Sequence, residues 1–156
     1  MGVCGCPGAE MKDFREETNE EGGGSGVRPS QLKQWPLQLH LVSPMAPYFQ
    51  KADLLLSADC VAYSLGDFHK DYLKGKSLAI ACPKLDEGQE EYAEKIASLI
   101  DDALINTLTV MIMQVPCCGG LLAIAKQGAE RAKRKIPIKV IIVGLNGDIL
   151  SEEWAS

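Results

Sequence analysis

Short apolar runs separated by polar and glycine-containing stretches recur along the chain after residue 35. Several of these runs are continuous rather than alternating, which is typical of strands that are buried on both faces of a parallel sheet. The predicted strands are residues 37–42, 53–58, 77–81, 108–115 and 138–145.

Helical periodicity lies between these runs. Residues 90–104 and 121–135 carry apolar residues at helical spacing, and the second segment ends in basic residues that suit a helix C-terminus. Residues 66–74 are a candidate for a shorter helix. Strands that alternate with helices predict right-handed crossovers. We therefore expect an α/β fold of the Rossmann-like or flavodoxin-like three-layer type, with a five-stranded parallel sheet flanked by helices.

The beginning of the chain has a different character. Residues 1–34 are rich in acidic residues and glycine, and they contain Cys4 and Cys6. Such a segment buries little apolar area, so it is expected to be a flexible tether. The predicted organisation is this N-terminal segment, an α/β domain over residues 35–150 and a C-terminal tail over residues 151–156.

Composition narrows the function classes. The chain has 156 residues, of which 46% are hydrophobic and 24% charged, enough for one folded domain. No apolar run is long enough to span a bilayer, and the start lacks the basic and apolar regions of a signal peptide, so we expect a cytoplasmic protein without a membrane partner. A net charge of −5 argues against nucleic-acid binding.

Four of the six cysteines follow predicted strands. Cys60 lies just after the second strand, Cys82 ends the third, and Cys117 and Cys118 follow the fourth. A lone cysteine in such a place is most often a small buried hydrophobic residue. The carboxyl ends of parallel strands, however, meet at one edge, where open α/β sheets bind ligands. We therefore expect the four thiols to converge there.

The neighbours of the cysteines favour a metal cluster. Cys6 and Cys82 are each followed by proline, and Pro116 precedes Cys117; Cys-Pro pairs occur in iron–sulfur ligation. Two glycines then open a predicted helix, whose N-terminus favours a thiolate. The Cys-x2-Cys pairs of zinc sites are absent, and so is the usual ferredoxin cysteine run. Four thiolates gathered by the fold suit a [4Fe–4S] cluster best.

Six sequence segments are distinctive enough to compare with a known family. They are SQLKQWPLQLHLV (30–42), APYF (46–49), ADCV (58–61), DFH (67–69), ACPKLD (81–86) and VPCCGGL (115–121). Together they resemble the C-terminal α/β domain of ferredoxin-like [4Fe–4S] iron–sulfur proteins of anaerobic microbes, over residues 1–150. Typical relatives carry a two-cluster ferredoxin module before a Gly-Cys-Pro-Gly segment, and this chain begins at that segment, without the module.

The resemblance implies iron–sulfur binding and electron transfer in anaerobic redox metabolism. It also implies a separate ferredoxin or oxidoreductase as the redox partner. The preferred ligands are Cys60, Cys82, Cys117 and Cys118. Cys4 and Cys6 are candidates for extra ligands, or for a second cluster between the two subunits of a homodimer. A larger cluster also stays open.

Two other functions fit the same residues. A cluster with one exchangeable iron could reduce a small substrate, with His40, Asp59 and Lys84 as candidate residues near the same edge. Alternatively, Cys117 and Cys118 could serve a thiol–disulfide or sulfur-transfer protein, although a disulfide between vicinal cysteines closes a strained ring. The sequence leaves open whether the protein is an enzyme.

Overall fold

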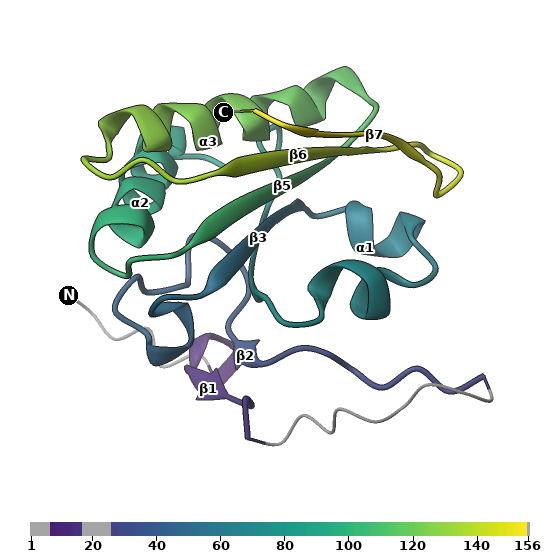
Figure 1. The fold of residues 1–156 in the computed structure, drawn as a ribbon, viewed down its shortest axis with the longest axis horizontal. Coiled ribbons are helices and arrows are strands. Elements are labelled where there is room, and N and C mark those ends of the chain that lie inside the picture. The colour runs from purple at the N-terminus through teal and green to yellow at the C-terminus, as the bar shows by residue number, and fades with distance from the viewer. Residues whose placement is uncertain (1–6, 17–25, 156) are drawn as a thin grey trace.

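A computed structural model describes residues 7–16 and 26–155 of the chain (Figure 1). The strands are β1 (Lys12–Asp13), β2 (Gln34–Trp35), β3 (Asp53–Ala58), β4 (Ser77–Ala81), β5 (Thr107–Met113), β6 (Ile138–Val143) and β7 (Ile149–Trp154). The α-helices are α1 (Val61–Ser64), α2 (Gln89–Asp101) and α3 (Gly119–Arg131). Shorter helical turns are η1 (Pro7–Ala9), η2 (Pro47–Phe49), the π-helical η3 (His69–Leu73) and η4 (Pro116–Cys118).

A five-stranded sheet in the order β4-β3-β5-β6-β7 forms the centre of the molecule. Strands β3 to β6 pair in parallel, and β7 pairs with β6 in the antiparallel direction. The predicted α/β fold with a five-stranded sheet flanked by helices is therefore confirmed. The expectation that all five strands are parallel is wrong, because the fifth is an antiparallel edge strand.

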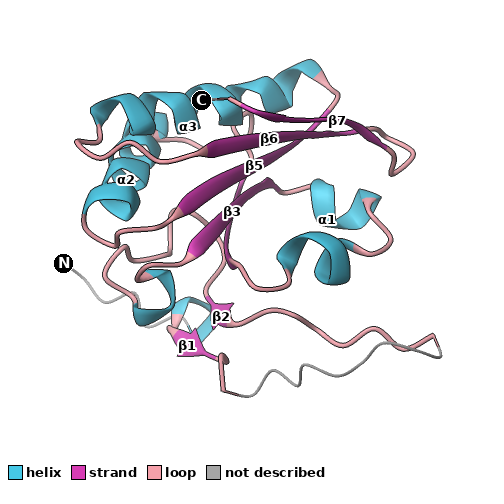
Figure 2. Cartoon of the chain, viewed as in Figure 1, coloured by secondary structure: helices cyan, strands magenta, loops and turns pink. Residues whose placement is uncertain are grey.

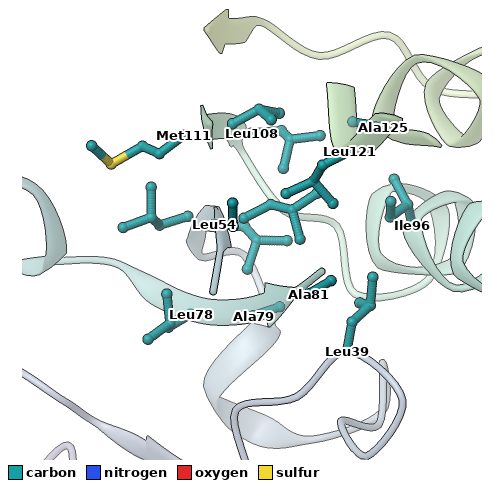
Figure 3. Close-up of a cluster of buried hydrophobic side chains, with 14 of the residues drawn as sticks. Leu39, Leu54, Leu78, Ala79, Ala81, Ile96, Leu108, Met111, Leu121 and Ala125 are labelled. Atoms are coloured by element: carbon teal, nitrogen blue, oxygen red, sulfur yellow. The ribbon is translucent and has the colours of Figure 1, made fainter. Parts of the chain in front are cut away.

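The helices lie in two layers around this sheet (Figure 2). The chain passes from β3 outward to β4, then back across β3 to β5 and on to β6. With right-handed crossovers, the α1–η3 connection lies on one face, and α2 and α3 lie together on the other. Figure 3 shows Ile96 of α2 and Leu121 and Ala125 of α3 among sheet residues such as Leu54 and Leu108, all of them buried. No helix in the described part of the chain is long and apolar enough to cross a membrane.

The predicted strand over residues 37–42 is not formed. Gln38 makes a single parallel bridge to Ile80 of β4, and the Leu39 N–H donates to the Ile80 carbonyl at 2.9 Å. The chain then turns, and the Val42 N–H donates to the Gln38 carbonyl at 3.0 Å. The apolar alternation that resembled a strand instead buries side chains on either side of a turn, and the prolines that follow favour such a turn.

The Gln34 side chain forms hydrogen bonds with β4 that a neighbouring strand would otherwise form. Gln34 is fully buried, and its Nε2 donates to the Leu78 carbonyl while its Oε1 accepts the Leu78 N–H, both at 2.8 Å. This pair of hydrogen bonds imitates a neighbouring strand. It therefore satisfies backbone groups that the edge strand β4 would otherwise leave without partners.

The end of the chain also differs from the prediction. Residues 151–154, expected to be part of a tail, belong to strand β7, where Ser151 pairs with Ile142 and Glu153 with Val140. The segment is too polar to resemble a buried strand, because an edge strand with an exposed face needs no continuous apolar run.

Part of the predicted flexible tether is bound to the domain. β1 pairs with β2, and the indole nitrogen of Trp35 donates to the Gly8 carbonyl at 2.6 Å. The Phe14 N–H donates to the Lys33 carbonyl at 2.7 Å. Residues 7–16 are therefore not a free linker. Cys4 and Cys6 lie outside the described residues.

Candidate functional site

Two of the predicted site residues follow neighbouring strands. Ala58, the last residue of β3, is paired with Ala81, the last residue of β4. Cys82 comes directly after β4, and Cys60 comes two residues after β3. The Asp59 N–H still donates to the Ala81 carbonyl at 3.2 Å, so the two chain segments stay together up to Asp59. Both thiols therefore begin from the same carboxyl edge of the sheet.

The other two described cysteines follow β5, which lies on the opposite side of β3. η4 contains Cys117 and Cys118 and leads directly into α3. The chain leaves β3 in one direction and returns to β5 in the other, so the strand order reverses between β3 and β5. Open α/β sheets bind ligands in the crevice at such a switch point. Cys60 lies on one side of it, and Cys117 and Cys118 lie on the other.

A close contact joins the Cys82 loop to the start of α3. A Cβ atom added to Gly120 would come within 3.0 Å of the Pro83 Cβ. Only glycine allows this approach without movement of the neighbouring loop. The loop after β4 and the segment after β5 therefore meet above the end of β3.

Backbone hydrogen bonds order the turn that leads into α3. The Cys118 N–H donates to the Val115 carbonyl at 3.1 Å, and the Gly119 N–H donates to the Pro116 carbonyl. The short helix η4 thus supplies the first partners of α3. This orders Cys117 and Cys118 and leaves fewer N–H groups free for a ligand at the start of α3.

The thiols differ in exposure and influence one another. Cys60 and Cys117 are exposed, Cys82 is half-buried and Cys118 is buried. Burial chiefly raises the pKa of the Cys118 thiol; a backbone hydrogen bond from Met113 opposes this, and the nearby Cys117 and Cys60 thiols raise it further. Cys118 is therefore held as a neutral thiol, and these three sulfur atoms are electrostatic neighbours.

Among the described residues, the donor set at this edge is four thiols, with no compact site for a single ion. Within residues 7–16 and 26–155, no three His, Cys, Asp or Glu side chains gather closely enough to hold one metal ion. An iron–sulfur cluster spreads its ligands over several irons, so its cysteines surround a larger volume. Thiolates are also the soft ligands that such clusters use. The four described cysteines at this edge are thus of the ligand type that iron–sulfur clusters use.

Two residues that the sequence did not single out shape the Cys82 loop. The Asp86 Oδ2 accepts the Cys82 N–H at 3.0 Å and the Tyr92 hydroxyl at 2.5 Å. Burial, followed by the bond to Asp86, strongly raises the pKa of Tyr92, so its hydroxyl keeps the proton that it donates. The only sequence signal was an aspartate four residues after Cys82, since aspartate side chains often close turns.

The three residues named for the alternative reductase differ in their burial and in their contacts. Asp59 has a buried Oδ1 without a hydrogen-bond partner among the described residues, and its pKa is raised by burial and then by the charge of Asp86. The His40 ring lies 4.4 Å from the Tyr92 ring, centroid to centroid, so it borders the same loop. Lys84 is exposed, and no hydrogen bond or ion pair of its side chain is described.

A sizeable cavity lies away from this edge. It has a volume of about 650 Å³ and lies between the end of α3 and the start of β6, at the amino edge of the sheet. A smaller cavity of about 360 Å³ includes Asp59 in its wall. We assign the site by its chemistry and by the switch point, because the larger hollow contains no cysteine.

One of the comparisons with known proteins identifies the domain. The profile of a family described as Rossmann-like domain matches residues 46–155. An uncharacterized protein of Archaeoglobus fulgidus is 27% identical over 119 residues, which are 76% of this chain and 83% of that protein. No solved structure matches the chain. None of these matches bears on iron–sulfur binding.

Proposed function

The chain belongs to the Rossmann-like domain family, and we propose that it binds an iron–sulfur cluster at the carboxyl edge of its sheet and takes part in electron transfer. The observation that carries the proposal is that all cysteines in the described residues follow β4, β3 and β5, three adjacent strands around the switch point. The proposed ligands are Cys60, Cys82, Cys117 and Cys118. A [4Fe–4S] cluster suits four thiolates.

In this proposal the protein supplies a stiff frame for the ligands. The bonds of Asp86 to the Cys82 N–H and to Tyr92 fix the loop after β4. Cys118 is anchored by its burial at the start of α3, while Cys60 and Cys117 face solvent. The cluster, when bound, would supply one-electron storage. The exposed sulfur atoms would lie where a partner protein can approach.

Cys4 and Cys6 remain candidates for further ligands or for a second cluster shared by two subunits. A separate ferredoxin or oxidoreductase remains the proposed redox partner, and anaerobic metabolism the proposed setting. Turnover of a substrate by the loaded protein would indicate the reductase alternative instead of a pure carrier.

The test is anaerobic purification followed by iron and sulfide assays and electron paramagnetic resonance. One cubane per chain predicts about four irons and four sulfides, with a brown colour. Cys60→Ser and Cys82→Ser should each lower bound iron. Ser64→Ala, which removes a hydroxyl bonded to the Cys60 carbonyl but no thiol, should not. A folded, colourless protein that takes up no iron on reconstitution would overturn the proposal. A disulfide between Cys117 and Cys118 in that protein would favour the thiol-transfer alternative.

A further inference from the structure

Three large apolar side chains are exposed at the carboxyl edge of the sheet, around the exposed thiols. Tyr63 in α1 is 94% exposed, Leu85 after β4 is 79% exposed, and Leu145 after β6 is 63% exposed. They follow β3, β4 and β6, whose carboxyl ends lie at the edge where Cys60 and Cys117 are also exposed. We call Tyr63, Leu85 and Leu145 the apolar rim.

Contacts between the loops hold the segments of the apolar rim together. A Cβ added to Gly147 would collide with the Ser64 carbonyl oxygen, so the turn between β6 and β7 packs against α1 at one end of the sheet (Figure 1). The Leu145 N–H donates to the Gln114 Oε1 at 2.7 Å, which ties Leu145 to the segment that leads to Cys117. The loop after β4 meets the start of α3. The apolar rim and the exposed thiols therefore belong to one surface.

This surface has the character of a protein interface. Single exposed apolar residues are ordinary, but a group of them on one surface marks an interaction site. Tyrosine is also enriched in protein interfaces and at their energetically important positions. The chain has a net charge of −5, whereas the three side chains of the apolar rim are neutral. The rim is therefore suited to exclude water against another protein.

The charges beside Leu85 indicate which protein covers the rim. Lys84 and Glu87 lie on either side of Leu85 in the chain; both are exposed, and neither has an ion pair among the described residues. In a two-fold contact, Lys84 of each copy would lie opposite Glu87 of the other. This loop is thus complementary to itself. A strongly acidic or strongly basic partner would instead bring like charges together at Glu87 or at Lys84.

A two-fold contact would also change the surroundings of the thiols. Within one chain, no three His, Cys, Asp or Glu side chains of the described residues gather closely. A second copy at this edge brings a second Cys60 and a second Cys117 to the first pair. It also covers sulfur atoms that a single chain leaves open to solvent and to oxidants.

We propose that two copies of the chain dock through the apolar rim, with Leu85 near the two-fold axis and with Cys60 and Cys117 of both copies enclosed between them. The docking follows from the surface of the chain itself, whereas a role of the dimer in shielding a cluster rests on the proposed function. A redox partner would then compete with the second copy for this edge.

Sedimentation velocity on the full chain, under anaerobic conditions and with a reductant that excludes disulfides, tests the contact. We expect a dimer that forms as the concentration rises. Tyr63→Lys should weaken the dimer by about tenfold or more, because it buries a charge in the apolar rim. Trp154→Lys is the matched control and should leave the dimer unchanged. Trp154 is also an exposed aromatic residue, at 61%, but it pairs with Lys139 at the amino edge of the sheet.

Charge reversal tests the two-fold arrangement. Lys84→Glu and Glu87→Lys should each weaken the dimer by about tenfold, since each variant places two like-charged pairs across the axis. An equal mixture of the two variants should restore the dimer, because every pair between the two chains then joins opposite charges. A residue with only a structural role in its own chain would not show this recovery.

A monomer at every concentration, equal weakening by Tyr63→Lys and Trp154→Lys, or a mixture that does not recover would each overturn the proposal. Iron is measured on the same samples, so the two proposals fail separately. A monomer that holds iron would contradict the dimer and leave cluster binding intact. A dimer that takes up no iron on reconstitution would support the docking and contradict the cluster.

Discussion

At the scale of single residues, the described cysteines are held by different means. Cys82 extends from a rigid strand, and its N–H is fixed by Asp86. Cys118 is buried at the start of α3, with a raised thiol pKa, so binding a metal there must displace a proton. A ligand that is already held in place loses little conformational freedom on binding. The surroundings of each thiol therefore set its contribution to metal affinity.

Cys82→Ser is expected to lower bound iron more than Cys4→Ser does. Cys82 is preorganised by β4 and Asp86, whereas Cys4 is flanked by glycine in a sequence whose ordering costs entropy. Iron and sulfide assays on the two variants, purified anaerobically side by side, measure the difference. An equal loss in both would mean that Cys4 is a full ligand.

At the scale of elements, α2 and α3 approach closely because Gly128 lies at their crossing. A Cβ at this position would lie 2.6 Å from Ile96 side-chain atoms, which is well inside van der Waals contact. The better helix propensity of alanine, about 1 kcal/mol, cannot offset a clash in a packed interface.

Gly128→Ala should therefore destabilise the protein by about 1–3 kcal/mol. Gly119→Ala is the matched control, because it is also in α3 and nothing lies within 4 Å of its added Cβ. Urea denaturation of both variants measures the two effects. If Gly128→Ala were as stable as Gly119→Ala, the result would contradict the close packing of α2 against α3 at Gly128.

A carboxylate joins the end of α2 to the loop after α3. Asp101 accepts the backbone N–H groups of Lys133 and Arg134 at 2.9–3.0 Å, and these bonds hold its pKa below the usual value. A lowered folded-state pKa contributes stability above the unfolded value of about 3.8, and this stability is lost as the pH falls through the folded value.

Asp101→Asn should accordingly cost stability at pH 7, and the difference from the unmodified protein should shrink below pH 4. Denaturant titrations of both proteins at several pH values between 7 and 3 would show it. Asp102→Asn, whose side chain accepts from Ser98 instead, is the neighbouring control. A stability difference that stayed constant with pH would contradict the role given to the Asp101 charge.

At the scale of the whole molecule, the sequence was sufficient to predict what depends on continuous apolar runs. Strands β3 to β6 and the arrival of Cys60 and Cys82 at one edge follow from such runs. The role of Gln34 could not be predicted, because a single side chain that bonds to the backbone of an edge strand leaves no periodic pattern in the sequence. The Asp86–Tyr92 bond depends on how the loop after β4 meets α2, and the cavity that includes Asp59 joins residues far apart in sequence, so both are evident only in the folded chain.

The same whole-molecule view indicates which parts of the protein a bound cluster would stabilise. The apolar core between the sheet and its helices contains Cys118 but none of the other three described cysteines, so nearly all of its contacts are independent of a metal. The loops over residues 58–66, 82–88 and 116–121 are held by far fewer buried side chains. A ligand that binds only the native state adds stability to the segments that it joins.

We therefore expect cluster removal to leave the strands, α2 and the part of α3 after its first turn intact, and to loosen those three segments. Amide hydrogen exchange on matched samples with and without iron should show faster exchange in residues 58–66, 82–88 and 116–121. The amide of Leu78, which lies within β4 and donates to the Gln34 side chain, is an internal control. Its exchange should not change. Unchanged protection in all three loops would mean that the cysteines are ordinary residues of the fold and that no cluster joins them.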